Sequence, residues 1–521
     1  MRSKGLREQR TPSHPSKHLP LMASLLSAVL LLAAVTAWSP AAGQAQAADV
    51  WPTYLANLNH RAYNAAFHAF GPATAPSISK KWSAYTSGQI VDNPAVAVVS
   101  NIHAGGCSGT SVVVAFAGTF SSSGGTGGAP GYLYAVNAST GALCWKTFLA
   151  ADVNPHPNQL CITTQAIAAS PTVATVSIKG VAKPVVYVAA SDIVFALNAA
   201  TGGIIWKNAL AGHGVGTFST TMIWSSPSVV NGRVYISTAS FCDETNPVDG
   251  AVYSLNAVSG GIVAKHSMLP NNAPGGGVWG SPTVSPSTGT VYVTTGNTYV
   301  AGQQACSTGQ PLSCAIVALD WNTLAVKASW QVPANQFVPD GDFGTTPTLF
   351  PGSGGATWLG AGNKNGRYYV LDAGNLTAGP KWQVQMANGG GNPVDGIIAP
   401  TAYYPLSITA GGTRCTGVLF LAAGSATFGG TAYGANFSAL CATTGKQLWR
   451  VGAAGHTLGA PVLANGMLAD AQGATLEVRN WSTGALLFHF AAGTIFEGAP
   501  AFANGLLYAG SLDHKLYAFG P

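Results

Sequence analysis

Charged side chains are scarce in this sequence, since Asp, Glu, Lys and Arg together make up 8% of its 521 residues. A chain so poor in charge can span a membrane or be disordered. Neither class fits, because the apolar residues come in short β-like runs that Gly, Pro and Asn interrupt. Residues 1–47 hold a net +4 of the total charge of +6, which leaves about +2 for residues 48–521. This charge excludes a nucleic-acid partner, which requires a concentrated basic face.

Several chemical motifs are also missing. No Cys-x-x-Cys spacing occurs, which argues against a zinc site, and no Cys-x-x-Cys-His occurs to attach a c-type haem. There is no Gly-x-Ser-x-Gly elbow and no phosphate-binding loop. The eight cysteines all follow residue 47, and an even number in an exported chain predicts disulfides. Their connectivity stays open, although Cys306–Cys314 and Cys415–Cys441 are plausible local pairs.

The N-terminus has the features of an export signal. Five basic residues precede an apolar run from Leu21 to Trp38, and Ala45-Gln46-Ala47 follows as a cleavage site. We therefore expect residues 1–47 to be a signal peptide and the mature, secreted chain to have no membrane span. An uncleaved membrane anchor is the alternative.

One sequence unit recurs along residues 48–521. Its first half is a small residue, a proline and a short β run. Its second half is an alternating strand, a turn of the Asn-x-Thr-Gly type and a further strand that often ends in Trp. The prolines are Pro94, Pro171, Pro227, Pro282, Pro347, Pro400, Pro461 and Pro500, and the alternating strands begin at Leu133, Val194, Val252, Ile316, Tyr368, Phe437, Leu476 and Leu516.

Eight such units predict an all-β, eight-bladed β-propeller. Each unit has room for about four antiparallel strands, which make one blade, and the alternation gives every strand two faces for packing. The last unit lacks its fourth strand. We expect residues 80–85, near the start of the mature chain, to supply it and to close the ring. Residues 48–521 then form a single domain.

The repeat resembles the PQQ (pyrroloquinoline quinone) type repeat of quinoprotein alcohol dehydrogenases, and most of all the polyvinyl-alcohol-dehydrogenase branch, without a haem domain. Trp51-Pro52-Thr53-Tyr54 and His60-Arg61-Ala62-Tyr63-Asn64 are similar to the N-terminal signature of that family. The resemblance implies PQQ and Ca²⁺ as cofactors. The same repeat also builds non-catalytic scaffolds of outer-membrane assembly, so the fold alone does not imply catalysis.

The resemblance also implies site residues. Trp279, in the segment Gly275–Pro282, matches the family tryptophan that lies flat under the quinone. Asn297 matches an asparagine that helps to hold Ca²⁺. Asp320 stands at the position taken for the catalytic base and a further Ca²⁺ ligand. The alternatives are a blade-packing Trp and two turn residues, because Asn or Asp recurs at this turn in other repeats.

Four more residues complete the predicted site. Glu244 corresponds to a family Ca²⁺ ligand, with Asp243 as its rival. Asp340 and Asp342 resemble the acidic segment beside the active site, and we expect them near the cofactor. Lys364 is the candidate for a basic residue that contacts the quinone, although its setting also suits a hairpin turn. The adjacent cysteines found in the best-known members of the family are absent.

These features favour a secreted, PQQ- and calcium-dependent alcohol oxidoreductase that passes hydride from a primary, secondary or polymeric alcohol to the quinone. An external electron acceptor is then needed, since no haem site exists. The first alternative is a cofactor-free propeller that binds proteins or polymers. The second is a carbohydrate-active hydrolase, which would need two carboxylates at glycosidase separation.

Overall fold

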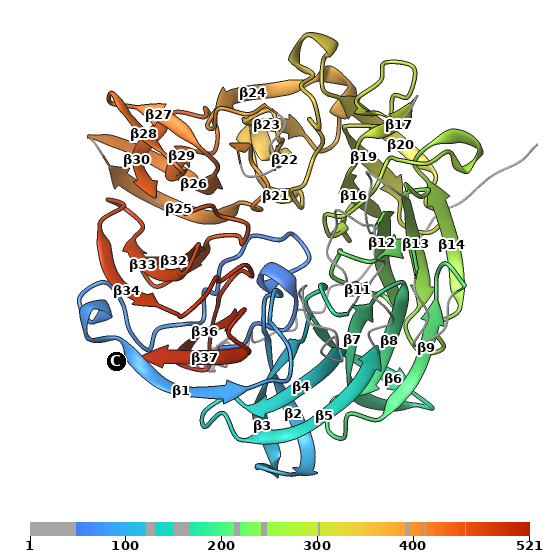
Figure 1. Cartoon of the computed structure of the whole chain (residues 1–521), viewed down its shortest axis with the longest axis vertical. Coiled ribbons are helices and arrows are strands. Elements are labelled where there is room, and N and C mark those ends of the chain that lie inside the picture. Colours follow the sequence, from blue (N-terminus) through green and yellow to red (C-terminus); the bar gives the residue numbers. More distant parts are fainter. Residues whose placement is uncertain are drawn as a thin grey trace, which may run out of the picture. The chain divides into compact units, whose positions relative to one another are not determined.

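The chain folds into a ring of β-sheets, shown in Figure 1 as a computed structural model. The structure describes residues 48–120, 131–150, 166–212, 219–240, 247–300, 303–390, 395–410, 412–453 and 455–521. The predicted signal peptide lies outside these residues. Within them, no helix is both long and apolar enough to cross a membrane.

Eight antiparallel sheets form the blades, so the predicted eight-bladed all-β propeller is confirmed. Blades 1 and 2 are β2 (Ala95–Ala104), β3 (Cys107–Gly118), β4 (Gly131–Asn137) and β5 (Leu143–Ala150), then β6 (Thr172–Ile178), β7 (Val181–Ala190), β8 (Ile193–Asn198) and β9 (Ile204–Ala209). Blades 3 and 4 are β10 (Thr221–Met222), β11 (Ser228–Val230), β12 (Arg233–Ser240), β13 (Ala251–Asn256) and β14 (Ile262–Ser267), then β15 (Thr283–Ser285), β16 (Thr290–Thr294), β19 (Ala315–Asp320) and β20 (Val326–Gln331).

The second half of the ring repeats this plan. Blades 5 and 6 are β21 (Thr348–Pro351), β22 (Thr357–Gly362), β23 (Arg367–Asp372) and β24 (Pro380–Gln385), then β25 (Ala402–Ala410), β26 (Thr413–Ala423), β29 (Ala435–Cys441) and β30 (Gln447–Ala453). Blades 7 and 8 are β31 (Val462–Ala464), β32 (Met467–Gln472), β33 (Thr475–Asn480) and β34 (Leu486–Ala491), then β35 (Ala501–Ala503), β36 (Leu506–Ser511), β37 (Lys515–Gly520) and β1 (Ser79–Tyr85). Two hairpins lie outside the blades: β17 (Thr298–Val300) with β18 (Gln303–Ala305), and β27 (Ala426–Phe428) with β28 (Thr431–Tyr433). The short 3-10 helices are Tyr54–Ala56, Ala75–Ser77, Pro270–Asn272, Ala334–Gln336, Ser353–Gly355 and Leu376–Ala378.

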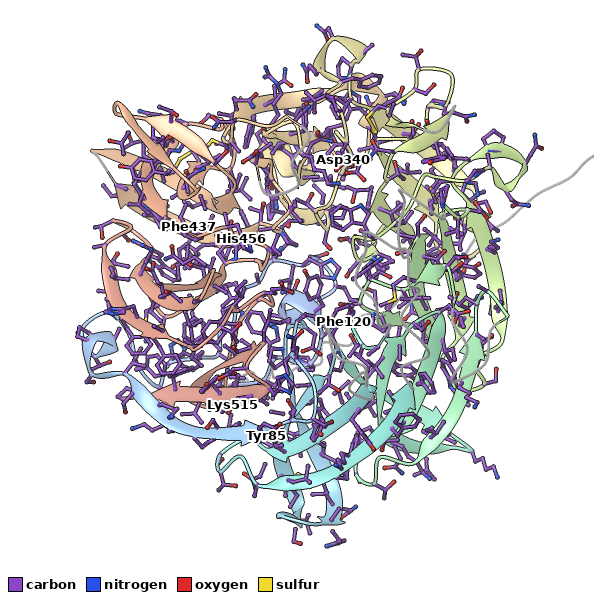
Figure 2. All side chains as sticks on the ribbon, viewed as in Figure 1. Tyr85, Phe120, Asp340, Phe437, His456 and Lys515 are labelled. Atoms are coloured by element: carbon purple, nitrogen blue, oxygen red, sulfur yellow. A yellow bond between two sulfur atoms is a disulfide. The ribbon has the colours of Figure 1, made fainter. Side chains whose placement is uncertain are left out.

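Strand β1 closes the ring. It pairs antiparallel with β37, and its last residue, Tyr85, stands opposite Lys515, as Figure 2 shows. Trp82 of β1 donates its indole N–H to the Ala138 carbonyl oxygen at 3.2 Å, and Ala138 belongs to the turn of blade 1. The predicted strand at residues 80–85 is therefore present, and the last blade has no open edge there.

The turn tryptophans connect neighbouring blades in the same way. Trp145 of blade 1 donates to the Ala199 carbonyl oxygen of blade 2 at 3.0 Å. The indole also covers the turn glycine Gly202, whose φ is +71° and whose Cβ, if present, would lie 2.5 Å from the ring. Only glycine satisfies both the backbone angle and the close approach. The Thr-Gly pair of the repeat is thus explained by packing between blades.

The small residue before the proline has a second use in blades 2 to 5, where it is Ser or Thr. Its hydroxyl accepts a backbone N–H from the preceding blade, for example Ser226 Oγ from Ser170 N at 3.0 Å and Ser281 Oγ from Ser226 N at 2.8 Å. These bonds link each blade to the next from blade 1 to blade 5.

The segment from Asp49 to Asn64 runs along the innermost strands of most blades (Figure 1). Its backbone forms hydrogen bonds with successive blades, in most cases at the second residue of the innermost strand. The bonds are Trp51 N to Val96 O (2.8 Å), Val173 N to Pro52 O (2.7 Å), Val284 N to Leu58 O (3.1 Å), Leu349 N to Asn59 O (3.0 Å), Tyr403 N to Arg61 O (2.8 Å), Leu463 N to Ala62 O (2.7 Å) and Asn504 N to Asp49 O (3.0 Å). This N-terminal strap satisfies inner-edge backbone groups that would otherwise be exposed.

Within the residues that the structure describes, three disulfides join Cys107 to Cys144, Cys306 to Cys314 and Cys415 to Cys441. The two pairings expected from the sequence are both present. Cys161 and Cys242 lie outside the described residues.

Candidate cofactor site between blades 4 and 5

Five of the seven predicted site residues come together at one end of blades 4 and 5. Trp279 lies in the loop before β15, and Asn297 follows β16. Asp340 and Asp342 lie in the loop between β20 and β21, and Lys364 sits in the hairpin between β22 and β23. Figure 2 marks the position of Asp340 at this junction of blades. Residues spread over 86 positions of sequence therefore form one cluster, which is called the candidate site below.

Lys364 is the centre of this cluster. Its Nζ lies 2.8 Å from Asp342 Oδ1 and 3.0 Å from both carboxylate oxygens of Asp340. Burial lowers the pKa of Lys364, but the two carboxylates more than offset this effect, so the pKa lies above its ordinary value and the side chain stays charged. With two carboxylates and one ammonium, the cluster has a net charge of −1 when all three groups are ionised.

Trp279 presents a partly exposed indole beside these charges. Its Nε1 donates to Asp342 Oδ2 at 3.3 Å, and Lys364 Nζ lies 5.1 Å from the ring centroid. The blade-packing tryptophans instead donate to a turn carbonyl of the next blade, as Trp206 does to Ala257 O. Trp279 therefore does not serve as a blade-packing residue of that kind.

A glycine makes room for the indole. A Cβ on Gly344 would lie 2.3 Å from Trp279 Cη2, which is well inside van der Waals contact. The backbone of the segment that follows Asp342 thus lies directly against the edge of the ring. Any larger residue at position 344 would push Trp279 out of its place.

Backbone bonds hold the loops of the cluster together. Lys364 N donates to Asp342 O at 3.0 Å, and Gly296 N donates to Gly277 O at 2.7 Å. A side-chain hydrogen bond also joins blade 4 to the segment before blade 5, since Thr294 Oγ1 donates to Thr345 O at 2.6 Å. The site therefore rests on fixed backbone positions rather than on free loop ends.

Asp340 has an unusual backbone conformation. Its φ is +47°, in the left-handed region that residues other than glycine seldom adopt. Its side chain is 23% exposed, whereas that of Asp342 is 3% exposed. Asp340 is thus the more solvent-accessible of the two carboxylates.

Asn297 is buried and contacts both the acidic loop and a disulfide. Its Nδ2 donates to Asp340 Oδ1 at 2.8 Å, while its Oδ1 lies 3.4 Å from the sulfur of Cys314. For Asn297 to offer its oxygen to a cation beside Asp340, the amide must make a half-turn. That rotation exchanges two atoms of almost equal size and needs no movement of the backbone.

Asp320 does not join the cluster, so the expectation that it lies there is wrong. It ends β19, where it pairs with Thr290 at the start of β16, whereas Asn297 follows the other end of β16. The length of the strand, about 17 Å, separates Asp320 from that end. Its Oδ1 accepts the backbone N–H groups of Thr323 at 3.0 Å and Asn322 at 2.9 Å, which lower its pKa. Asp320 is a turn-forming residue, like Asn198 in blade 2.

Glu244 and its rival Asp243 lie outside the residues that the structure describes. The cluster itself offers two carboxylates and one amide. Within the described residues, no three His, Cys, Asp or Glu side chains are grouped closely enough to hold a metal. A cation at the candidate site would therefore need further oxygen ligands.

The residues fit such a cation and a quinone in kind. Hard oxygen donors from Asp340, Asp342 and Asn297 suit Ca²⁺ or a similar ion, and the net negative charge of the cluster favours it. The partly exposed, planar indole of Trp279 suits a planar ring system. Lys364 supplies a fixed positive charge for anionic groups on that ring system.

Sequence reasoning missed two neighbours of the cluster. The disulfide Cys306–Cys314 lies against Asn297, and the spacing of the cysteines gave no sign of this contact. A cavity of about 440 Å³ is lined in part by Asn365, the residue after Lys364, and amide groups make up much of its lining. Its lining residues are Asn335, Gln336, Phe337, Val338, Asn365, Arg367, Gln385, Ala387 and Asn388. The abundance of Asn and Gln around residues 335 and 385 was a signal that could have been noticed.

The ring of repeats and this cluster define a PQQ-type β-propeller. Residues 129–320 and 434–520, together more than half of the chain, match the family described as outer membrane protein assembly factor BamB. The chain belongs to this family of PQQ-type repeat proteins. Among curated proteins, a polyvinylalcohol dehydrogenase from Pseudomonas sp. is 25% identical over 283 residues. That alignment spans 47% of this chain and 40% of the dehydrogenase.

Solved structures support the same fold over a longer stretch. A europium-containing methanol dehydrogenase superposes with a TM-score of 0.62 at 16% identity, covering 91% of this chain and 98% of that one. The quinohemoprotein alcohol dehydrogenase from Comamonas testosteroni has a TM-score of 0.62 at 17% identity, with 91% and 81% covered. At these identities the likeness establishes the fold, and the chemistry must be argued from the site.

Proposed function

We propose that this protein is a PQQ-dependent alcohol oxidoreductase whose cofactor and Ca²⁺ bind at the candidate site. The observation that carries the proposal is the convergence of Trp279, Asn297, Asp340, Asp342 and Lys364 from separate loops. The likeness to a polyvinylalcohol dehydrogenase and to two alcohol dehydrogenase structures supports it.

Each residue of the candidate site would have a separate role in binding the quinone or the cation. Trp279 would support one face of the quinone, and Lys364 would face its anionic groups. Asn297 and Asp342 would contribute oxygen ligands to the cation, together with Glu244. When bound, the quinone accepts hydride from the alcohol, and the cation polarises it as a Lewis acid.

Asp340 takes the role of base that the sequence had suggested for Asp320. Its carboxylate is the more exposed of the two in the cluster, and it is held by Asn297 Nδ2 and Lys364 Nζ. An alcohol bound above Trp279 would pass its hydroxyl proton to an oxygen of Asp340. Lys364 cannot take this proton, because its raised pKa keeps it charged.

The cation is proposed as Ca²⁺, although the same oxygen donors would also accept a trivalent ion. A europium-containing relative in fold makes a lanthanide the second ion to test. The net charge of −1 in the cluster is compatible with either ion, and the added charge would draw the trivalent ion in more strongly.

We also propose that the protein acts outside the cytoplasmic membrane once residues 1–47 are removed, and that an external acceptor reoxidises the cofactor. The three disulfides support an oxidising compartment. N-terminal sequencing of protein recovered from outside the cell should give a chain that starts near Ala48. A chain that keeps residues 1–47 would contradict this.

Reconstitution tests the enzymatic proposal. The full mature chain is incubated with PQQ and either Ca²⁺, a lanthanide or a chelator, and dye reduction is followed with primary, secondary and polymeric alcohols. We expect alcohol-dependent reduction only with PQQ and a cation together. Absence of turnover in every combination, with the protein folded, would favour a cofactor-free binding scaffold instead.

A further inference from the structure

We infer that the disulfide Cys306–Cys314 is a positioning element of the candidate site, which holds Asn297 and the acidic segment 340–342 in the arrangement that binds a cation. The inference rests on the proposed cation site, and it adds residues that the resemblance does not supply.

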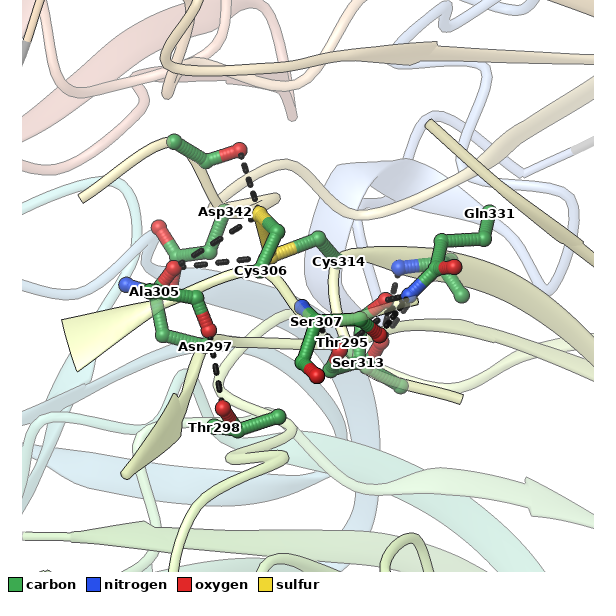
Figure 3. Close-up of a disulfide and its surroundings, with 12 residues drawn as sticks. Thr295, Asn297, Thr298, Ala305, Cys306, Ser307, Ser313, Cys314, Gln331 and Asp342 are labelled. Atoms are coloured by element: carbon green, nitrogen blue, oxygen red, sulfur yellow. Dashed lines mark hydrogen bonds between the residues drawn. A yellow bond between two sulfur atoms is a disulfide. The ribbon is translucent and has the colours of Figure 1, made fainter. Parts of the chain in front are cut away.

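The disulfide touches both partners of the cation site (Figure 3). Cys314 Sγ lies 3.4 Å and Cys306 Sγ 3.8 Å from Asn297 Oδ1, and Cys306 Sγ lies 3.7 Å from the Gly341 carbonyl oxygen. A disulfide sulfur has no hydrogen to donate, so these are packing contacts. Gly341 stands between the two carboxylate residues, so one sulfur bears on the backbone that carries them.

The backbone around Cys314 is also built into the site. Cys314 N donates to Gly296 O at 2.9 Å, next to Asn297, and the Cys314 side chain is fully buried. Its φ is +46°, a conformation that a residue with a Cβ seldom adopts. Backbone of this kind persists only where the surroundings impose it, and the disulfide is one such constraint.

A separate clamp holds the loop that the disulfide closes. Gln331 Nε2 lies 2.9 Å from each of the carbonyl oxygens of Ser307, Gln310 and Ser313 (Figure 3). These bonds fix the course of residues 307–313 without help from the sulfurs. Removal of the disulfide should therefore leave the loop folded and should act mainly on Asn297 and on segment 340–342.

The chain offers a matched control in Cys415–Cys441. Its two Cα atoms are 5.6 Å apart, as are those of Cys306–Cys314, but 26 positions of sequence separate its cysteines instead of 8. Loop entropy predicts that loss of the control bond costs at least as much stability. Cys441 is the last residue of β29, the strand of blade 6 that corresponds to β19 of blade 4. It therefore lies at the end of its blade that corresponds to Asp320, and not at the end that corresponds to the candidate site.

The experiment compares C306A/C314A with C415A/C441A in the full mature chain. Terbium(III), a hard cation whose luminescence is excited through nearby tryptophan, is titrated into each protein, and thermal unfolding is recorded alongside. We expect the control to bind as the wild type does, and C306A/C314A to bind roughly tenfold to a hundredfold more weakly, the usual effect of losing a supporting contact to a metal ligand. Equal affinity in both variants would overturn the inference.

Hydrogen exchange separates this inference from the proposed function. In C306A/C314A, peptides covering residues 294–300 and 338–344 should exchange faster than in the wild type, while in C415A/C441A they should not. Wild-type protein that binds no cation, with or without PQQ, would refute the proposed cation site. In that case unchanged exchange in C306A/C314A would also refute the positioning role, whereas faster exchange would uphold it as a structural constraint on the same segments.

Discussion

The ammonium nitrogen of Lys364 lies 2.8 Å from a carboxylate oxygen of Asp342, and both side chains are almost fully buried. Asp340 shares the same ammonium group from the more exposed side. One positive charge therefore compensates for one of the two carboxylates, and the remaining negative charge is what a bound cation would neutralise.

Replacement of Lys364 by Met should destabilise the protein by about 3–5 kcal/mol, because it removes the ammonium group whose positive charge compensates two neighbouring carboxylates. Saturating Ca²⁺ should restore part of this loss. The matched control is Lys381→Met, which breaks an exposed pair with Asp372 at 3.5 Å and should cost under about 1 kcal/mol. Denaturant unfolding measures both, and equal losses in the two variants would contradict the central place of Lys364.

Trp279 and Trp206 should respond in opposite ways to replacement by Ala. Trp206 packs between blades and is 8% exposed, so its loss should cost about 3–5 kcal/mol of stability and leave turnover intact. Trp279→Ala should unfold much like the wild type but lose alcohol-dependent dye reduction. If Trp279→Ala proves as unstable as Trp206→Ala while retaining activity, Trp279 is only a packing residue.

Replacement of Asp340, a residue of the candidate site, and of Asp320, a turn residue of the repeat, should have different effects on activity. Asp340→Asn should lower kcat by roughly 10²–10⁴-fold, the usual contribution of a general base. Asp320→Asn should stay within about twofold of the wild type and within about 0.5 kcal/mol in stability, because Asn forms the same turn in other repeats. Steady-state kinetics with one alcohol settles both, and loss of activity in Asp320→Asn alone would restore the original assignment.

His60 makes the N-terminal strap sensitive to acid. Its Nδ1 lies 2.7 Å from Thr283 Oγ1, and because that hydroxyl donates to Pro347 O, the histidine N–H must be the donor. Burial lowers the pKa of His60 from 6.5 to about 3. Between these values the unfolded chain binds a proton that the folded chain does not, so stability falls as pH falls below 6.5.

His60→Asn tests this pH dependence. Asn can donate to Thr283 and tolerates the φ of +53° at this position. Between pH 7.5 and 4.5 the wild type should lose roughly 2–3 kcal/mol more than the variant, as the two pKa values require. Chemical denaturation at several pH values measures it, and parallel curves for the two proteins would show that His60 is not the group responsible.

The architecture could be predicted from the sequence because the same packing contacts between blades recur around the ring, and they require the same residue types each time. In blades 1, 2, 3, 6 and 7 the turn has a glycine under the tryptophan of the preceding blade, so the same residues recur in the sequence of each of these blades. The missing strand at the C-terminus pointed directly to Trp82 and its neighbours. The contacts of the N-terminal strap were not predicted; its residues were noted only for their similarity to the N-terminal signature of the family. Trp51 and His60 contact blades that lie far apart along the chain, and residue spacing does not reveal such contacts.

The site was only partly predictable. Trp279, Asn297, Asp340, Asp342 and Lys364 lie together, and their roles toward a cofactor or a metal stay predictions. Asp320 was expected at the site but lies at the other end of its strand, because Asn or Asp stands at this turn position in most repeats and a strand's two ends look alike in sequence. The contact of Cys314 with Asn297 depends on how a loop folds back over a strand end, which residue spacing does not encode.

The most direct test of the account is a titration of PQQ into the mature protein with and without Ca²⁺, followed by quinone absorbance and tryptophan fluorescence. The account predicts one quinone bound per chain, binding that depends on the cation, and a marked loss of affinity in Asp342→Asn. Binding that ignores Ca²⁺ and is unchanged in Asp342→Asn, or no binding at all by the folded wild type, would contradict it.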